Sequence, residues 1–167
     1  MTKLNTLIED IYSKIECISD EKDLEIPDAM AEEFGERMKQ ALLHWAKPKA
    51  QTKGLRMSNI GKPSRQLWYE SRDENNKNKL SSPVLIKFLY GHLLEELLLL
   101  FVKLSGHKVT DEQKEVEVNG IVGHMDCKID GEVVDVKTAS GRAFNKFKSG
   151  TLAEDDPFGY IAQLCGY

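Results

Sequence analysis

Two tight-turn dipeptides in the second half of the chain, Asn119-Gly120 and Asp130-Gly131, place the strongest constraint on the fold. Asn-Gly and Asp-Gly are the pairs that two-residue β-hairpin loops prefer, because both central positions take a positive φ. After Gly106 the apolar residues change from a helical to a strand pattern. The sequence therefore predicts a three-stranded antiparallel meander with strands at 114–118, 121–129 and 132–138.

The second turn also determines the register of its hairpin. If Asp130-Gly131 forms a two-residue loop, Asp126 lies opposite Asp135 and His124 lies opposite Lys137. The apolar side chains then share the other face, which we expect to pack on the core: Met125, Cys127, Ile129, Val134 and Val136. The polar face presents two carboxylates and an ammonium group close together.

Two aspartates directly opposite each other repel, so their presence there indicates a compensating cation. Hard divalent cations such as Mg²⁺ and Mn²⁺ prefer carboxylate oxygens and are often shared with a substrate phosphate. Lys137, on the same face, could orient a metal-bound water and offset charge on a reacting phosphate. The alternative is a solvent-facing strand with ordinary alternation of acids and bases, and a register slip of one residue would invert the geometry.

The longest apolar run, 84–104, predicts a helix in the centre of the domain, covered on several sides, with a proline just inside its start. Its charged residues argue against a membrane span. Lys87, Gly91 and Glu95 follow one line at a spacing of four, so a carboxylate stands above a glycine that leaves space beside it. Glu95 is therefore a candidate third metal ligand, unless Lys87, His92 or a neighbouring residue simply neutralises it.

The first part of the chain predicts two amphipathic helices, over about 4–18 and 30–45, with a break at Pro27 and Asp28. Although the whole chain has a net charge of −4, residues 47–72 contain seven bases and one acid. This basic segment is a candidate for phosphate contact or else a solvated connector. The polar residues 72–83 predict a surface loop.

The end of the chain predicts a polar loop at 140–155 followed by one last helix. Asp156-Pro157 is typical of an N-cap with proline at the first helical position. Gln163 and Tyr167 are four residues apart and share a helix face, where an amide and a phenol could contact a phosphate or a base. We divide the chain into a helical and basic region at 1–83 and a core at 84–167.

Length and composition exclude several classes of protein. A chain of 167 residues, 41% hydrophobic and 30% charged, can bury a core without disulfides or a structural metal. Its three cysteines include no CxxC pair, which argues against a disulfide framework, a zinc ribbon or a four-cysteine iron–sulfur cluster. The first ten residues lack the pattern of a signal peptide, so we expect a soluble intracellular protein.

Four short motifs, taken in order, resemble those of the PD-(D/E)xK nuclease superfamily, specifically its RecB-like and phage (lambda-type) exonuclease branch. They are G-x-x-x-E at Gly91–Glu95, G-H-x-D at Gly123–Asp126, D-x-K at Asp135–Lys137 and Q-x-x-x-Y at Gln163–Tyr167. The match covers half of the chain, residues 84–167. Upstream, MSNIGKPSRQLWYE is similar to a segment that carries a cysteine in the iron–sulfur members. Here that position is Pro63 or Ser64, which implies that the cluster is absent.

The resemblance implies a restriction-endonuclease-like α/β fold, with an N-terminal helical region beside a core of helix, three-stranded meander and helix. It implies a metal-dependent DNA exonuclease of phage or bacterial recombination, repair or DNA degradation. By analogy, one or two Mg²⁺ or Mn²⁺ ions would be bound by Glu95, Asp126, Asp135 and the carbonyl of Val136, while Lys137 positions water. DNA contacts would come from five further residues: Ser58, Arg65, His124, Gln163 and Tyr167.

Other expectations follow from the same resemblance. DNA would run along the basic segment and the bases of the loop at 140–155, Arg142, Lys146 and Lys148. The protein would act in the cytoplasm of a bacterium or a phage-infected host, away from membranes. Members of this fold continue into another strand after the Q-x-x-x-Y helix, so the core would be shortened at its C-terminal end.

Three alternatives remain open. The chain could be a DNA-binding module with an inactive nuclease core. It could instead be a structure-specific or restriction-type endonuclease. The acidic N-terminal helices could also bind a recombination partner protein or a second copy of the chain, as in a scaffold with weak nuclease activity.

Overall fold

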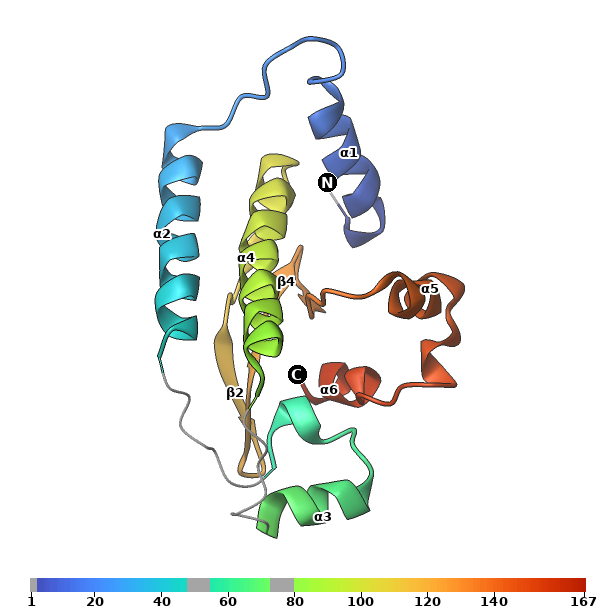
Figure 1. The fold of residues 1–167 in the computed structure, drawn as a ribbon. Helices are drawn as coiled ribbons and strands as arrows, with labels where there is room; N and C mark the ends of the chain where they lie inside the picture. The colour runs from blue at the N-terminus through green and yellow to red at the C-terminus, as the bar shows by residue number, and fades with distance from the viewer. Residues whose placement is uncertain (1–2, 48–54, 73–79) are drawn as a thin grey trace.

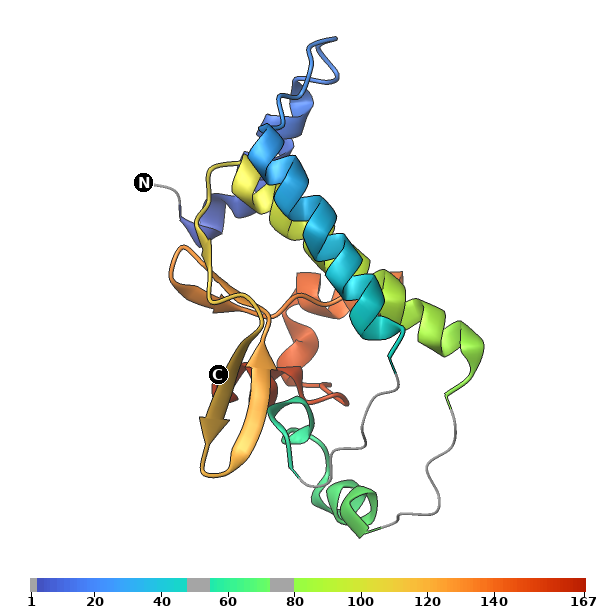
Figure 2. The same ribbon diagram turned by 90° about the vertical axis from the view of Figure 1, so that its left-hand side faces the viewer.

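Two long helices, α2 (Asp28–Trp45) and α4 (Ser82–Leu104), run side by side along one face of the molecule (Figures 1 and 2). This computed structural model describes residues 3–47, 55–72 and 80–167. Proline marks both helix starts, as predicted: Pro27 precedes α2, and Pro83 lies in the first turn of α4.

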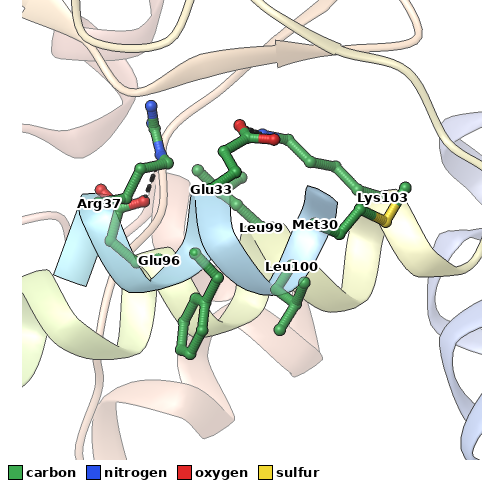
Figure 3. A pocket seen from close by; sticks show the side chains of 8 residues that line it. Met30, Glu33, Arg37, Glu96, Leu99, Leu100 and Lys103 are labelled. Atoms are coloured by element: carbon green, nitrogen blue, oxygen red, sulfur yellow. Dashed lines mark hydrogen bonds and ion pairs between the residues drawn. The ribbon is translucent and has the colours of Figure 1, made fainter. Parts of the chain in front are cut away.

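The predicted first helix is also confirmed. It consists of the short 3-10 helix η1 (Leu4–Thr6) and α1 (Leu7–Glu16), which packs against α4. Charged pairs join α2 to α4 as well. Figure 3 shows Arg37 of α2 and Glu96 of α4 pointing toward one another, with Arg37 Nε 2.7 Å from Glu96 Oε2. The predicted helical region thus packs on the element that carries the Glu95 motif.

The environment of α4 differs from the prediction. Leu99 and Val102 are 2% and 0% exposed, yet several other large apolar side chains of the helix lie at the surface: Leu85, Ile86, Phe88, Tyr90, Leu94 and Leu98. The expectation that this helix is covered on several sides therefore holds only in part, because α1, α2 and β1 contact it while much of its remaining apolar surface is exposed. An apolar sequence favours burial of the helix, but neighbouring elements of the fold determine how much of it is buried. None of the helices in the described ranges is long and apolar enough to cross a membrane.

The strands form two small antiparallel sheets. One has the order β1-β4-β5, with β1 at Val109–Thr110, β4 at Cys127–Ile129 and β5 at Glu132–Val134. The other pairs β2 (Lys114–Val118) with β3 (Ile121–Met125). The chain is thus of mixed α/β class, with helices around a small antiparallel sheet.

Both predicted turns are confirmed. Asn119, Gly120, Asp130 and Gly131 all have positive φ, between 52° and 95°. Such angles at both central positions are those of a type I′ turn, whose twist matches that of the flanking strands. The predicted register of the second hairpin is confirmed too, because Ile129 pairs with Glu132 and Cys127 with Val134 in the ladder.

The middle strand of the predicted meander is not continuous, because it breaks at Asp126. The carbonyl oxygen of Asp126 accepts a hydrogen bond from the Gln113 amide at 2.9 Å, and its carboxylate accepts one from the Val136 amide at 2.7 Å. The side chain thus occupies the position of a backbone partner, and the β4–β5 ladder ends at the pair Cys127–Val134. The third strand consequently stops at Val134 instead of Thr138.

The break also overturns one predicted cross-strand pair. His124 does not pair with Lys137, because the β4–β5 ladder ends at Cys127–Val134, and its ladder partner in the other sheet is Glu115. The apolar face is as predicted for Met125, Cys127 and Ile129, which are all buried.

The core lies where α4, α1 and the three-stranded sheet meet. Leu99 and Val102 of α4 form a buried cluster with Cys127 and Ile129 of β4. Partly buried apolar residues surround this cluster: Leu4, Leu7, Ile11, Val109 and Val134. β4 therefore contributes apolar side chains to the core, and Asp126 directly precedes its first residue. This places the candidate site beside the core.

Two further short helices lie within the basic segment. The 3-10 helix η2 (Met57–Asn59) packs against β3 and against the last helix, and α3 (Ser64–Arg72) follows it. Neither helix was expected from the sequence pattern. Residues 48–54 of the basic segment and 73–79 of the predicted surface loop lie outside the described residues.

The predicted polar loop at 140–155 is largely helical. It contains α5 (Gly141–Ser149) and the 3-10 helix η3 (Thr151–Ala153). The Ser140 side chain accepts a hydrogen bond from the Ala143 amide and so caps the start of α5. Ser140 and Gly150, at the two ends of α5, are the sequence signals that could have revealed it.

The last helix, α6, spans Tyr160–Gly166, so it begins later than the predicted start at Pro157. Asp156 still contributes to its start, because Oδ2 accepts a hydrogen bond from the Ile161 amide at 2.9 Å. Figure 1 shows α5 and α6 on one side of the sheet, joined by the segment that contains η3.

Candidate active site

Lys137 bridges the two aspartates that the sequence predicted to face each other. Its ammonium nitrogen lies 2.5 Å from Asp135 Oδ1 and 3.7 Å from Asp126 Oδ2. Asp126 stands between β3 and β4, and Asp135 directly follows β5, so the ends of the strands bring the two carboxylates together. The predicted juxtaposition is confirmed, although both residues lie just outside the ladder.

The electrostatics of this cluster follow from partial burial. Burial raises the pKa of Asp126, more than the nearby Lys137 and the Val136 amide lower it. For Lys137, burial favours the neutral amine, but the hydrogen bond that it donates to Asp135 and the charges of Asp126, Asp135 and Glu95 outweigh this effect and raise the pKa. Lys137 is thus held as a cation among carboxylates.

Glu95 reaches the same cluster from α4. Burial, together with the negative charge of Asp126, raises its pKa to about 7. Its described hydrogen bond comes from Gln113, whose Nε2 lies 2.7 Å from Glu95 Oε1. Gln113 and the nearby charge of Lys137 lower this pKa, but not enough to offset burial. No sequence signal pointed to Gln113, which reaches Glu95 only through the packing of the β1–β2 loop on α4.

Gly91 lies where its motif requires, one turn before Glu95. A Cβ atom added to Gly91 would lie 3.7 Å from Thr138 Oγ1, directly after Lys137 in the chain. The segment that carries Lys137 therefore passes close to this part of α4. Glu96, the neighbour of Glu95, has a different role because it pairs with Arg37 of α2.

The last helix contributes Gln163 and Tyr167, as predicted. Gln163 is 9% exposed, and its Nε2 lies 3.4 Å from Asp135 Oδ1 and 3.3 Å from the Tyr167 hydroxyl. That hydroxyl donates to the carbonyl oxygen of His124 at 2.8 Å. Burial raises the pKa of Tyr167, which keeps the phenol protonated as a donor. The Q-x-x-x-Y pair thus joins α6 both to the aspartate cluster and to β3.

Gly123, the first residue of the G-H-x-D motif, makes room for η2. A Cβ atom at this position would lie 2.5 Å from Cβ and Cγ of Met57 and 3.0 Å from Tyr167. Met57 is 2% exposed and also contacts α6 near Gly166. The Met57 side chain therefore locks η2, β3 and α6 together beside the site. Ser58, the next residue, is exposed on η2.

Two other predicted DNA-binding residues, Arg65 and His124, have partners outside the aspartate cluster. The Arg65 guanidinium of α3 lies 6.0 Å from the centre of the Tyr69 ring, and no acid pairs with it among the described residues. His124 is exposed, with Nε2 3.5 Å from Glu115 Oε2. It lines a groove of about 420 Å³ together with Glu95, Gln113, His44 and His92.

The donor chemistry of the cluster fits a hard divalent cation, because carboxylate oxygens are the ligands that Mg²⁺ and Mn²⁺ prefer. Burial is the main cause of the raised pKa values of Glu95 and Asp126, and repulsion from neighbouring carboxylates adds to it. Within the described ranges, however, no three His, Cys, Asp or Glu side chains converge closely enough to hold a metal ion. The Val136 amide donates to Asp126, and the structure assigns no contact to the Val136 carbonyl that was predicted as a ligand.

No protein-family model matches this chain, and no curated protein or solved structure with which it was compared is similar to it.

Proposed function

We propose that this chain is a metal-dependent deoxyribonuclease of the PD-(D/E)xK kind, acting as an exonuclease. The observation that carries the proposal is the Lys137 bridge between Asp126 and Asp135, with Gln163 on the same oxygen of Asp135. Four elements distant in the sequence bring their motif residues to one place, which ordinary surface alternation of charges does not require.

The order of the elements also supports a restriction-endonuclease-like core. α4 carries Glu95, the strands around the second hairpin carry the aspartates, and α6 carries the amide and the phenol. The core differs from the uninterrupted meander of the expectation because its strands divide into two sheets at Asp126. That division places the Asp126 carboxylate at the end of the β4–β5 ladder, where it can serve as a ligand.

In this proposal Glu95, Asp126, Asp135 and the Val136 carbonyl would hold one or two Mg²⁺ or Mn²⁺ ions. Such an ion would supply charge stabilisation at the scissile phosphate and a more acidic water. Lys137 is held as a cation by the two aspartates, so it donates hydrogen bonds to the attacking water or to a phosphate oxygen. Gln163 orients the Asp135 carboxylate, and Tyr167 anchors α6 to β3.

The DNA strand would approach over the surfaces that carry Ser58, Arg65 and His124. Arg65 and Ser58 belong to the basic segment, which can attract the phosphate backbone to a chain that is otherwise acidic. His124 lines the groove that also contains Glu95, so a strand in that groove would pass the candidate site.

Digestion of end-labelled linear duplex DNA, single-stranded DNA and covalently closed circular DNA tests the proposal. Mg²⁺ or Mn²⁺ should support release of nucleotides from the linear substrates, a chelator should abolish it, and the closed circle should stay intact. The purified protein should contain no iron. Cleavage of the closed circle would instead identify an endonuclease.

Three variants sharpen this assay: Asp126→Asn, Asp135→Asn and Lys137→Met. Each should lose at least about 10²-fold in rate, because each removes a ligand or the cation from the reacting centre. Glu117→Gln and Lys22→Met are matched controls at exposed positions and should retain wild-type rates. Wild-type cleavage by a site variant, or no cleavage by the wild type under any condition, would contradict the proposal.

A further inference from the structure

A second cavity adjoins the candidate active site on the side of α5 and α6. It has a volume of about 330 Å³, and the residues between Lys137 and Tyr160 line it. Small-molecule sites typically have volumes of roughly 300–1,000 Å³ and combine apolar walls with a few polar groups. Lys137 lies at its margin, so the cavity and the aspartate cluster share one residue.

Aromatic rings form one wall of this cavity. The Phe158 and Tyr160 rings stack with centroids 5.5 Å apart and planes 30° apart, and the Phe147 ring lies 5.9 Å from Tyr160. Phe158 is 62% exposed, so much of its surface remains open to solvent. A large exposed ring supported by a second ring is a ready stacking surface for another flat π system.

The charges around the cavity favour an anion. Lys137, Arg142 and Lys146 are among its lining residues, together with one acid, Asp155. Asp155 pairs with Lys146, and Lys137 is held by the aspartate cluster. Arg142 is exposed on the first turn of α5 and makes no hydrogen bond or ion pair with any described residue. Its guanidinium is therefore available for a phosphate.

We infer that this cavity binds one unpaired nucleotide of a DNA strand whose neighbouring phosphate lies at Lys137, an inference that rests on the proposed nuclease function. The base stacks on the open face of Phe158, and Arg142 contacts the phosphate of that nucleotide. A base inside such a cavity has left the double-helical stack, so the inferred ligand is a single strand or a frayed end rather than intact duplex. A protein ligand could pack against the aromatic rings, but it would not require three cationic side chains beside them. The cations therefore favour a ligand that carries phosphate.

Binding of a fluorescently labelled oligothymidylate, followed by anisotropy in the presence of a chelator, tests the inference without cleavage. Phe158→Ala should weaken binding by about 5- to 100-fold, the range for loss of one stacked base. Phe88→Ala is the matched control, because Phe88 is 47% exposed on α4 and lines neither this cavity nor the adjoining one beside Asp135. It should change the affinity by less than about 2-fold.

Two further measurements locate the contacts. Arg142→Gln should weaken binding and reduce the slope of log affinity against log salt by about 1, as expected for one lost phosphate contact. Under ultraviolet light, an oligonucleotide that carries 5-iodouracil should become cross-linked to Phe158 or Tyr160. Both exposed substitutions should leave the circular dichroism spectrum unchanged, which separates loss of binding from loss of fold.

The outcomes separate this inference from the proposed function. If Phe158→Ala binds like wild type and the cross-link maps elsewhere, the nucleotide cavity is wrong even when the protein cleaves DNA. If the protein never cleaves DNA but Phe158→Ala still loses single-strand binding, the cavity stands and the nuclease proposal fails. Equal loss of affinity in Phe88→Ala and Phe158→Ala would indicate a general apolar surface and overturn the inference.

Discussion

The backbone amide of Val136 donates a hydrogen bond to Asp126 Oδ2 at 2.7 Å, across the point where the β4–β5 ladder ends. This one bond links the fold to the candidate site. It replaces the next backbone pair of the ladder, and it points the Asp126 carboxylate toward the segment that carries Asp135 and Lys137. A carboxylate that accepts from a main-chain amide is fixed in orientation, as a metal ligand or a lysine partner must be.

The first prediction concerns the Lys137 bridge. Lys137→Met should lower the free energy of unfolding by about 1–3 kcal/mol, because it leaves two partly buried carboxylates facing each other. Chemical denaturation measures this change. The added substitution Asp135→Asn should restore part of the loss, whereas Lys22→Met, at an exposed pair, should change stability by less than about 0.5 kcal/mol. Equal stability of Lys137→Met and wild type would show that the bridge is not formed.

The second prediction is a pH dependence at Glu95. Its pKa is about 7 in the folded chain against an ordinary value of 4.5, so folding favours the protonated form. The stability that Glu95 contributes is therefore present below pH 4.5 and is lost as the pH rises through 7. The difference in unfolding free energy between wild type and Glu95→Gln should fall steadily across this window. A difference that does not change with pH would contradict a buried Glu95.

The third prediction concerns the close approach of Gly123 to Met57. Gly123→Ala should destabilise the chain by about 1–3 kcal/mol, because the new Cβ would overlap Met57 and force η2 away from β3. Met57→Ala in the same chain should relieve the overlap. Gly35→Ala provides the contrast, since an added Cβ meets nothing within 4 Å there and should stabilise α2 by up to about 1 kcal/mol. Thermal unfolding compares all four proteins.

The fourth prediction concerns the described part of the basic segment. Arg65→Gln should weaken DNA binding in Ca²⁺ and reduce the salt slope by about 1, with little effect on turnover at saturating DNA. Lys137→Met should lower turnover by a larger factor than affinity, because its cation acts mainly in the transition state. Lys14→Gln, on the acidic α1, is the control. Unchanged affinity and salt slope in Arg65→Gln would identify the segment as a solvated connector.

Local chemistry made part of the structure predictable. The two turn dipeptides require positive φ at adjacent positions, and few other sequences supply it, so the hairpins and the pairing of Ile129 with Glu132 could be derived without any distant contact. Prolines at helix starts and helical spacing of apolar residues act over a single turn and located α1, α2 and α4. α5 was missed even though its capping residues, Ser140 and Gly150, stand in the sequence.

Several residues of the candidate site could be predicted from the sequence, but the contacts that they make could not. Spacing and turn register identified Asp126, Asp135 and Lys137 as site residues. They did not predict that Glu95 contacts Gln113, that His124 contacts Glu115 or that Arg65 lies near the Tyr69 ring. The partner of Glu95 depends on how α4 and the β1–β2 loop pack, which pattern alone does not specify.

The sequence by itself determined where helices and turns begin and which residues share the polar end of the second hairpin, because these features depend on neighbours a few positions away. Only the tertiary structure decided three others: the strand break at Asp126, the exposure of much of α4, and the aromatic cavity beside Lys137. Each depends on side chains that meet across segments far apart in the chain. Their positions follow from the packing of the whole domain and not from any local preference.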